Sequence, residues 1–394
     1  MNSFDDISTD LEQREAAGLY RRRRLVGSAM GREIIVDGQR LLNFCSNDYL
    51  GLAADERVRD ALIAATREWG AGSGASHLVC GHTRAHHELE EALADFTGRP
   101  RALLFSSGYA ANVGTINALT GRGDFVFEDK LNHASLLDGG LLSGARFKRY
   151  RHRDTEDLEA CLTAAGEGRK LVVTDGTFSM DGTVCDVAAT AALARRHGAW
   201  LMVDEAHSFG VTGPDGRGLV RENSIAASDV PVVIGTLGKA FGTQGGFVTG
   251  SDALIETLIQ HARTYIYSTA IPAAIAAATL TSLELARSEH WRRERLQELI
   301  TRFRDGASQL GMQLVDSHTP IQPVLLGDER SALDASAALE AQGLLITAIR
   351  PPTVPAGTSR LRITLTAAHT DDDVDRLLDG LGKIAGGTAG RVSA

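Results

Sequence analysis

The chain has 394 residues, 43% of them apolar and only 5% aromatic, which is enough for a large core spread over more than one domain. Its formal net charge of −9, with one short basic run at residues 21–24, argues against a general nucleic-acid-binding protein. The cysteines form no CxxC pair, so zinc-ribbon and thioredoxin-like chemistry is disfavoured and a reducing compartment is expected; they are Cys45, Cys80, Cys161 and Cys185.

The N-terminal segment predicts no targeting signal. Residues 1–18 are acidic and lack an apolar stretch, so no signal peptide is expected. The longest apolar-looking stretch, residues 270–285, contains Pro, Thr and Ser and is too short and too polar to cross a membrane. We therefore expect a cytoplasmic protein without membrane attachment.

The first 52 residues predict an N-terminal helix and an extended arm. Residues 8–24 are expected to form a helix with charged faces. In residues 27–43 an Asp–Gly pair stands between two apolar runs, which predicts a β-hairpin.

Residues 53–284 alternate between helical and strand patterns, which predicts a large α/β domain. Helices are expected at 56–70, 86–98, 108–121 and 187–198. Strands are expected at 101–107, 124–129, 170–176, 199–208 and 230–240. Short, continuously apolar strands between helices indicate a mostly parallel sheet covered on both faces. Such sheets bind ligands beyond the carboxyl ends of their strands.

Residues 285–385 predict a smaller C-terminal α+β domain. A long charged helix is expected at 287–310 and a closing helix at 371–384. Between them lie strand-like segments near 321–326, 344–349 and 360–366. The last residues, 386–394, are predicted to be a disordered tail.

The segment GTLGKAFG, residues 235–242, places Lys239 between glycines just after an apolar strand. A Walker-type phosphate loop would need Ser or Thr directly after the lysine, and Ala follows instead. A GxGxxG dinucleotide-binding motif is absent as well. Taken alone, the segment is equally well explained by a surface turn with an incidental lysine.

Asp204 and His207 end another apolar strand, in VDEAHSFG. A buried Asp costs free energy unless it meets a positive partner. One such partner is the protonated pyridine nitrogen of pyridoxal 5′-phosphate (PLP), because that pairing keeps the ring an electron sink. A structural capping pair or a metal site would also explain the two side chains, although no third metal ligand is obvious.

The segment FSSGYAAN, residues 105–112, ends a strand and opens a helix. Its backbone N–H groups can therefore cradle a phosphate, although Ser–Gly turns before helices are common. A phosphate cradle, then an Asp at a strand end, then a lysine after a later strand is the order found in fold-type I PLP enzymes, the aspartate aminotransferase-like proteins.

Seven motifs narrow this resemblance to the α-oxoamine synthases. They are SNDYLGL (46–52), GSGASHLVCG (72–81), LNHASLLDG (131–139), FSMDG (178–182), DEAHSFG (204–210), GTLGKAFG (235–242) and IRPPTVPAGTSRLRITLTAAH (349–369). Within the family, RPPTVP most resembles the members of the biotin pathway. The resemblance implies PLP as cofactor, L-alanine and pimeloyl-CoA or pimeloyl-ACP as substrates, and a homodimer with a shared active site.

The resemblance also implies roles around the cofactor. Lys239 would carry PLP and serve as the base for the Cα proton. Asp204 would pair with the ring nitrogen, and His133 would stack on the ring. Ser179 and His207 match groups that hold the ring or hydrogen-bond its phenolic oxygen. Phosphate contacts are expected from Gly108, Tyr109 and Thr236, and from Ser268 and Thr269 of a neighbouring subunit.

Arginine side chains are expected to bind the substrate. Arg362 matches the family position that grips the amino-acid carboxylate, since a fork-shaped cation suits that group. Asn47 is a predicted helper, and Arg350 is a nearby rival for the same role. Arg21 matches a substrate-binding arginine, whereas the rest of its basic run is expected to stay solvated. Thr353 is expected at the acyl end.

Alternatives remain within and outside the family. Glycine C-acetyltransferase, 5-aminolevulinate synthase and serine palmitoyltransferase types differ mainly in their acyl thioester, and one sequence does not reveal pocket shape. A non-catalytic partner subunit of the same fold would be expected to lack Lys239. His82, His86 and His87 stand close together in the sequence, but without an HExxH pattern, and we expect no metal there.

Overall fold

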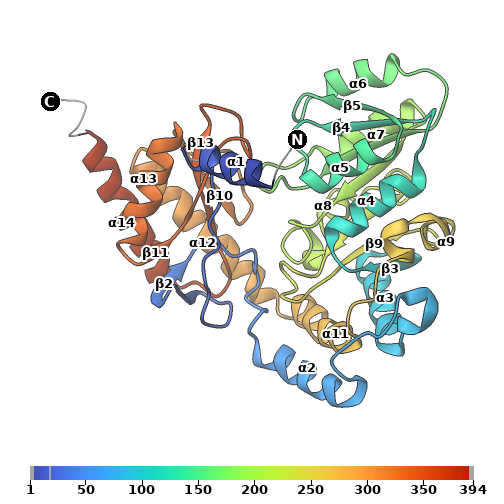
Figure 1. Ribbon diagram of the computed structural model, residues 1–394, viewed down its shortest axis with the longest axis horizontal. Helices are drawn as coiled ribbons and strands as arrows, with labels where there is room; N and C mark the ends of the chain where they lie inside the picture. The colour runs from blue at the N-terminus through green and yellow to red at the C-terminus, as the bar shows by residue number, and fades with distance from the viewer. Residues whose placement is uncertain (1–3, 17–18, 390–394) are drawn as a thin grey trace.

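The computed structural model describes residues 4–16 and 19–389 and places them in two lobes (Figure 1). The larger lobe contains a seven-stranded sheet, and the smaller lobe contains two three-stranded sheets. Helices α11 (Ala273–Ser288) and α12 (His290–Gln309) follow one another and join the lobes.

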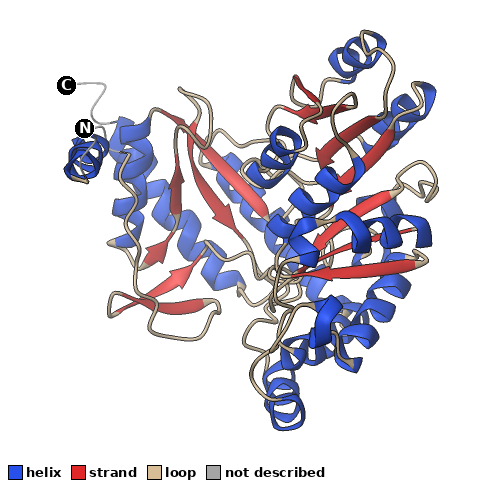
Figure 2. Ribbon diagram, turned by 45° about the vertical axis from the view of Figure 1, so that its right-hand side comes forward, coloured by secondary structure: helices blue, strands red, loops and turns tan. Residues whose placement is uncertain are grey.

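The seven-stranded sheet of the large lobe is mostly parallel, as predicted. Only β9 runs antiparallel to its neighbours, and Figure 2 shows helices on both sides of these strands. The strand order is β3 (Arg101–Phe105), β9 (Gly246–Gly250), β8 (Val232–Thr236), β7 (Trp200–Asp204), β6 (Lys170–Asp175), β4 (Phe125–Asp129) and β5 (Arg146–Tyr150). The central strands are buried along nearly their whole length, which explains their continuous apolar sequences.

Several helices of the large lobe begin at a short polar side chain that caps them. Ser107 and Asp186 each accept a hydrogen bond from a first-turn backbone amide. The helices are α2 (Glu56–Trp69), α3 (Arg84–Thr97), α4 (Gly108–Leu119), α5 (Ala134–Leu142), α6 (Thr155–Thr163), α7 (Val187–Arg196), α8 (Leu219–Glu222), α9 (Asp252–His261) and α10 (Arg263–Ile266). A π-helical turn at His77–Gly81 precedes α3, and a 3₁₀ turn at Pro214–Gly216 precedes α8.

The small lobe combines both ends of the chain. The predicted hairpin forms β1 (Glu33–Val36) and β2 (Gln39–Asn43), and β2 then pairs in parallel with β11 (Leu344–Leu345). Asp37 and Gly38 turn the hairpin with φ angles of 50° and 84°. The second sheet has the order β10 (Ile321–Gly327), β13 (Ser359–Thr364) and β12 (Thr347–Ile349).

Helices pack against the small-lobe sheets and close the chain. They are α12, α13 (Glu329–Glu340) and α14 (Asp371–Ala389). Because α14 continues to Ala389, the predicted disordered tail is wrong for residues 386–389, which are helical. Residues 390–394 lie outside the described part of the chain.

The N-terminal helix is shorter than predicted. Helix α1 covers Asp5–Ala16, and residues 19–25 are not helical. Within this extended segment the Arg24 guanidinium pairs with Glu340 at 2.6 Å and with Asp37 at 2.9 Å. Arg24 remains exposed to solvent, as expected, and its charge also ties the segment to the small lobe.

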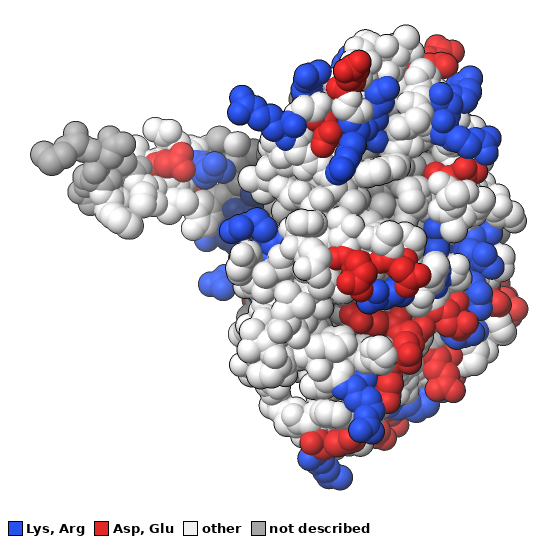
Figure 3. All heavy atoms as spheres, turned by 90° about the vertical axis from the view of Figure 1, so that its right-hand side faces the viewer, with Lys and Arg blue, Asp and Glu red and all other residues white. Residues whose placement is uncertain are grey.

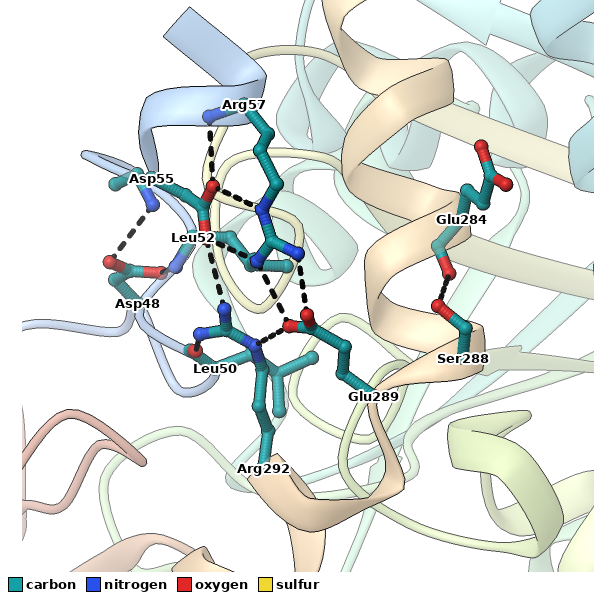
Figure 4. Close-up of polar contacts among 10 residues, drawn as sticks. Asp48, Leu50, Leu52, Asp55, Arg57, Glu284, Ser288, Glu289 and Arg292 are labelled. Atoms are coloured by element: carbon teal, nitrogen blue, oxygen red, sulfur yellow. Dashed lines mark hydrogen bonds and ion pairs between the residues drawn. The ribbon is translucent and has the colours of Figure 1, made fainter.

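Four alternating charges lie where α11 breaks into α12 (Figure 4). Arg292 donates to the Leu50 carbonyl at 2.6 Å and to the Asp55 carboxylate at 2.9 Å. Arg57 bonds the same Asp55 at 2.8 Å, and both arginines also contact Glu289. The start of α2 is thereby fixed to the connection between the lobes.

The surface shows no single dominant charge on the face seen in Figure 3, where acidic and basic side chains lie side by side. Within residues 4–16 and 19–389, no helix is both long and apolar enough to cross a membrane.

Candidate active site

Three neighbouring parallel strands end in polar residues on one side of the large sheet. Asp175 ends β6 and lies opposite Asp204, which ends β7. Lys239 follows β8 in the next turn. The fold thus brings together the lysine and the aspartate that the sequence had placed after separate strands.

A chain of hydrogen bonds leads from Lys239 into the protein. Its Nζ lies 2.9 Å from Nε2 of His207, and Nδ1 of His207 lies 2.6 Å from the Tyr49 hydroxyl. The hydroxyl also lies 3.3 Å from Oδ1 of Asn47. A single assignment of donors and acceptors accounts for all three hydrogen bonds. The lysine donates to His207, the imidazole donates to Tyr49, and Tyr49 donates to Asn47.

Burial sets the protonation states along this chain. It lowers the pKa of the Lys239 amine to about 8, although the Asp204 and Asp175 carboxylates oppose the shift. Burial, followed by the neighbouring Lys239 charge, holds the pKa of His207 well below its usual value, and burial raises the pKa of Tyr49 to about 12. The imidazole and the phenol are therefore neutral near pH 7, and an amine with a pKa near 8 is suited to act as a base.

The Asp204 carboxylate is buried and prepared for a cationic partner. It accepts hydrogen bonds from Nδ2 of Asn112 at 2.7 Å and from the Ala206 amide at 2.9 Å. Among the described residues, no Lys or Arg forms an ion pair with it. Such a carboxylate fits a protonated ring nitrogen, and Asn112 is itself fixed by Ser135 at 2.9 Å.

Asp175 positions the loop that carries His133. Its carboxylate accepts the His133 backbone amide at 2.7 Å. Burial and the nearby Asp204 raise its pKa well above the ordinary value, so this pair of carboxyl groups avoids holding two charges. His133 caps α5, and its Nδ1 lies 2.7 Å from the Ser135 hydroxyl, which fixes the imidazole plane.

The first turn of α4 forms a cradle for an anion. Gly108 and Tyr109 are its first two residues, so their amides have no partner within the helix. Thr236 lies beside this turn, since a Cβ built on Gly108 would lie 3.6 Å from the threonine Cβ. A Cβ on Gly246 would come within 2.5 Å of the Gly108 nitrogen, so glycine there lets the backbones approach. The Tyr109 hydroxyl donates to Asp138.

Arg362 projects from β13 of the small lobe into the same hydrogen-bond network. Its Nη2 donates to Asn47 at 3.1 Å, its Nε to the Ser179 carbonyl at 2.7 Å and its Nη1 to Thr364 at 2.9 Å. This fixed guanidinium retains further N–H groups for a ligand. The rival Arg350 lies in the loop after β12, where its carbonyl accepts the Thr353 amide at 3.1 Å.

A cavity of about 720 Å³ opens next to these groups. Both lobes contribute to its walls: His133, Phe178 and Ser179 from the large lobe, Thr353 and Val354 from the small lobe. Its size and mixed lining suit an extended acyl chain with a polar end.

Other predicted contacts lie apart from this network. Thr269 is paired with Ser76 through an isolated bridge, and Ser268 precedes it in the segment after α10. Arg21 is exposed in the extended N-terminal segment. In the described ranges, none of these three predicted residues hydrogen-bonds to Lys239, so their roles remain predictions.

Three site residues were not singled out from the sequence. Tyr49 and Asn112 lie inside quoted motifs, SNDYLGL and FSSGYAAN, but their partners are distant in the sequence. Asp175 ends a predicted strand, and this position at a strand end could have identified it as a site residue.

Comparisons relate this chain to known proteins. The family described as aminotransferase class I and II matches residues 39–381. An 8-amino-7-oxononanoate synthase from Nitrosococcus oceani is 62% identical over 372 residues, which are 94% of this chain and 99% of that protein. One from Pseudomonas syringae pv. syringae is 60% identical over 376 residues, 95% of each.

Solved structures are also similar. A serine palmitoyltransferase from S. paucimobilis, with PLP bound as its myriocin adduct, has a TM-score of 0.92 at 32% identity and covers 98% of both chains. An 8-amino-7-oxononanoate synthase from Francisella tularensis has a TM-score of 0.77 at 32% identity, covering 87% of this chain and 97% of that one.

Proposed function

The chain belongs to the 8-amino-7-oxononanoate synthases, within the class I and II aminotransferase family, and we propose that it condenses L-alanine with a pimeloyl thioester. It is a PLP-dependent acyltransferase of biotin biosynthesis. In the proposed reaction, Cα of L-alanine bonds to the acyl carbonyl carbon, the carbon–sulfur bond breaks, and the alanine carboxyl group leaves as CO₂. The other products are 8-amino-7-oxononanoate and the free thiol of coenzyme A or acyl carrier protein.

The cofactor fits the groups described above. Asp204 supplies the buried carboxylate for the ring nitrogen, and the first turn of α4 with Thr236 supplies phosphate contacts. Lys239 supplies the amine that holds the cofactor, and His133 supplies a flat ring fixed by Ser135. When bound, PLP would accept electron density from the amino-acid Cα and so make its proton acidic.

The observation that carries the proposal is the link between Arg362 and Lys239. Asn47 accepts from Arg362 at 3.1 Å and from Tyr49 at 3.3 Å, and the chain continues through His207 to the lysine amine. A carboxylate held by the guanidinium would place the amino-acid Cα toward this amine. Lys239 would take the Cα proton, and neutral His207 would orient its amine.

The cavity next to His133 is the proposed acyl site. Thr353 and Val354 lie in its small-lobe wall, and Phe178 lies in its large-lobe wall. Arg360 is ion-paired with Asp181 at its edge. We assign the pimeloyl chain to this cavity because its walls combine apolar and polar side chains.

We also propose a homodimer that works in the cytoplasm. Several large apolar side chains are more than half exposed, which is unusual unless a partner covers them; they are Leu78, Val79, Leu141, Leu142 and Tyr267. Ser268 and Thr269 adjoin Tyr267, so a partner there would meet the predicted phosphate contacts. All four cysteines are free, which is typical of a reducing compartment.

The test is product formation by the purified, PLP-loaded protein. L-Alanine with pimeloyl-CoA should give 8-amino-7-oxononanoate, detected by mass spectrometry, together with one equivalent of free thiol. Arg362→Lys should raise KM for L-alanine at least about tenfold and change KM for pimeloyl-CoA little, because lysine lacks the fork of arginine. Arg350→Lys is the matched control for the rival position.

Two results would contradict the proposal in different ways. If the protein converts glycine or serine with another acyl-CoA, but not L-alanine with pimeloyl-CoA, the substrate assignment is wrong and the reaction type still holds. A KM for L-alanine that rises in Arg350→Lys, and not in Arg362→Lys, would move the carboxylate site.

A further inference from the structure

A group of imidazoles and a carboxylate lies outside the active site, between the π-helical turn at His77–Gly81 and α3. His82, His87 and Glu90 each direct one possible ligand atom toward a common point, and these three atoms lie within 4.8 Å of one another. They border a cavity of about 430 Å³ beside the edge strand β3. Figure 1 shows α3 and β3 side by side in the large lobe.

The Glu90 carboxylate is held in place and lacks a strong cationic partner. Its side chain is only 13% exposed, and its Oε1 accepts the Leu104 amide of β3 at 2.9 Å. In the described part of the chain, the single basic group recorded in an ion pair with it is His82, at 4.0 Å. Oε2 is therefore a fixed, largely buried carboxyl oxygen whose ionised form a cation would stabilise.

The His82 imidazole is arranged as a metal ligand would be. Its Nδ1 lies 3.0 Å from Nδ1 of His77, a ring stacked on Tyr265 at 5.0 Å. When His82 donates from Nδ1 to His77, its Nε2 lone pair faces Glu90. A hydrogen bond from the second ring nitrogen is the usual way to orient a histidine that binds a metal.

The third ligand atom comes from His87, which lies one turn before Glu90 on α3. His87 and Glu90 are three residues apart, so they share one face of the helix. His87 is 63% exposed and lies 3.4 Å from Glu91, so its ring can turn without disturbing the core. His86 is not available, because its Nδ1 bonds to Thr83 and its Nε2 lies 2.7 Å from the Ile271 carbonyl.

We propose that His82, His87 and Glu90 form a binding site for a divalent transition-metal ion such as Zn²⁺. Two imidazole nitrogens and one carboxylate oxygen suit Zn²⁺ or Co²⁺ and disfavour Ca²⁺ and Mg²⁺, which prefer oxygen ligands. Ligand bonds of about 2.0–2.2 Å place donor atoms about 3–4 Å apart, so His82 and Glu90 need almost no movement. Such a site reverses the expectation drawn from the sequence, which considered the histidines without Glu90.

The test is metal binding by the full-length, PLP-loaded protein without a histidine tag. Isothermal titration with Zn²⁺ should show one equivalent per chain, and Co²⁺ should give visible absorption bands of a protein-bound ion. His87→Gln and Glu90→Gln should each weaken binding at least about tenfold. Gln at position 90 keeps a side-chain oxygen for the Leu104 amide, and His87 is exposed, so both variants should fold.

Two control variants remove other candidate ligands. His318→Gln removes a histidine whose side chain is 85% exposed, and Cys80→Ser removes the exposed thiol near the site. Both should bind Zn²⁺ as the unaltered chain does. The proposal is wrong if His87→Gln and Glu90→Gln also bind like the unaltered chain, or if no stoichiometric binding occurs.

Discussion

Removing the Lys239 amine should stabilise the cofactor-free protein near neutral pH. Burial lowers the pKa of this amine from 10.5 to about 8, so the folded state binds its proton less tightly than the unfolded state. At 1.36 kcal/mol per pH unit, the charged amine costs the folded state about 3 kcal/mol at pH 7. Lys239→Met should therefore be the more stable protein at that pH.

The pH dependence distinguishes this charge effect from better packing of methionine. Between pH 8 and 10.5 the folded protein has lost the proton while the unfolded chain keeps it, so the cost disappears as the pH rises. The advantage of Lys239→Met should shrink from about 3 kcal/mol at pH 7 to about 1 kcal/mol at pH 10.

Urea unfolding of both cofactor-free proteins at pH 7 and pH 10 measures this difference. Lys148→Met, which removes an exposed lysine from β5, controls for the loss of a lysine charge. An advantage of equal size at both pH values, or a Lys239→Met variant that is less stable at pH 7, would refute the reasoning.

Three further changes test other parts of the structure. Tyr49→Phe leaves Nδ1–H of buried His207 without its acceptor and should lower the free energy of unfolding by about 1–3 kcal/mol; an unchanged value would contradict the 2.6 Å bond. Gly246→Ala, whose Cβ would lie 2.5 Å from a cradle nitrogen, should weaken PLP binding at least about tenfold in a cofactor titration, whereas Gly121→Ala, in open space, should not. Arginine hydrogen bonds lower the pKa of Asp55 to about 2 from 3.8, so stability should fall by about 2 kcal/mol as the pH drops from 5 to 1, and Asp55→Asn should lack that loss in acid titration.

The sequence predicted best those elements whose environment is uniform. Strands β6, β7 and β8 are buried on both faces, so they are apolar throughout and stand out. Strand β5 was missed because it is an edge strand with the sequence RFKRY, mostly exposed to solvent. The N-terminal helix was predicted too long because consecutive arginines suit a helix locally, and the pairing of Arg24 with distant Glu340 was not visible.

The same distinction applies to the candidate site. Lys239, Asp204 and His207 could be selected because each follows a recognisable strand, and the structure brings them together. Tyr49 and Asn112 could not be selected, because their part in the site depends on hydrogen bonds to residues far along the chain, His207 and Asp204. The same reason hid Glu90, whose relation to His82 depends on the turn between them.

The pairing of β2 with β11 has a consequence for protein synthesis. Leu42 leaves the ribosome long before its partner Leu344, because every strand of the large lobe lies between them in the sequence. Until then the hairpin is a solvent-exposed two-stranded ribbon, marginal in stability and open to wrong partners. The large lobe, whose strands are all contained within residues 101–250, can fold during translation. The small lobe must wait until β13 (Ser359–Thr364) has been synthesised, so slow or interrupted translation should yield a folded large lobe and an unfolded small lobe.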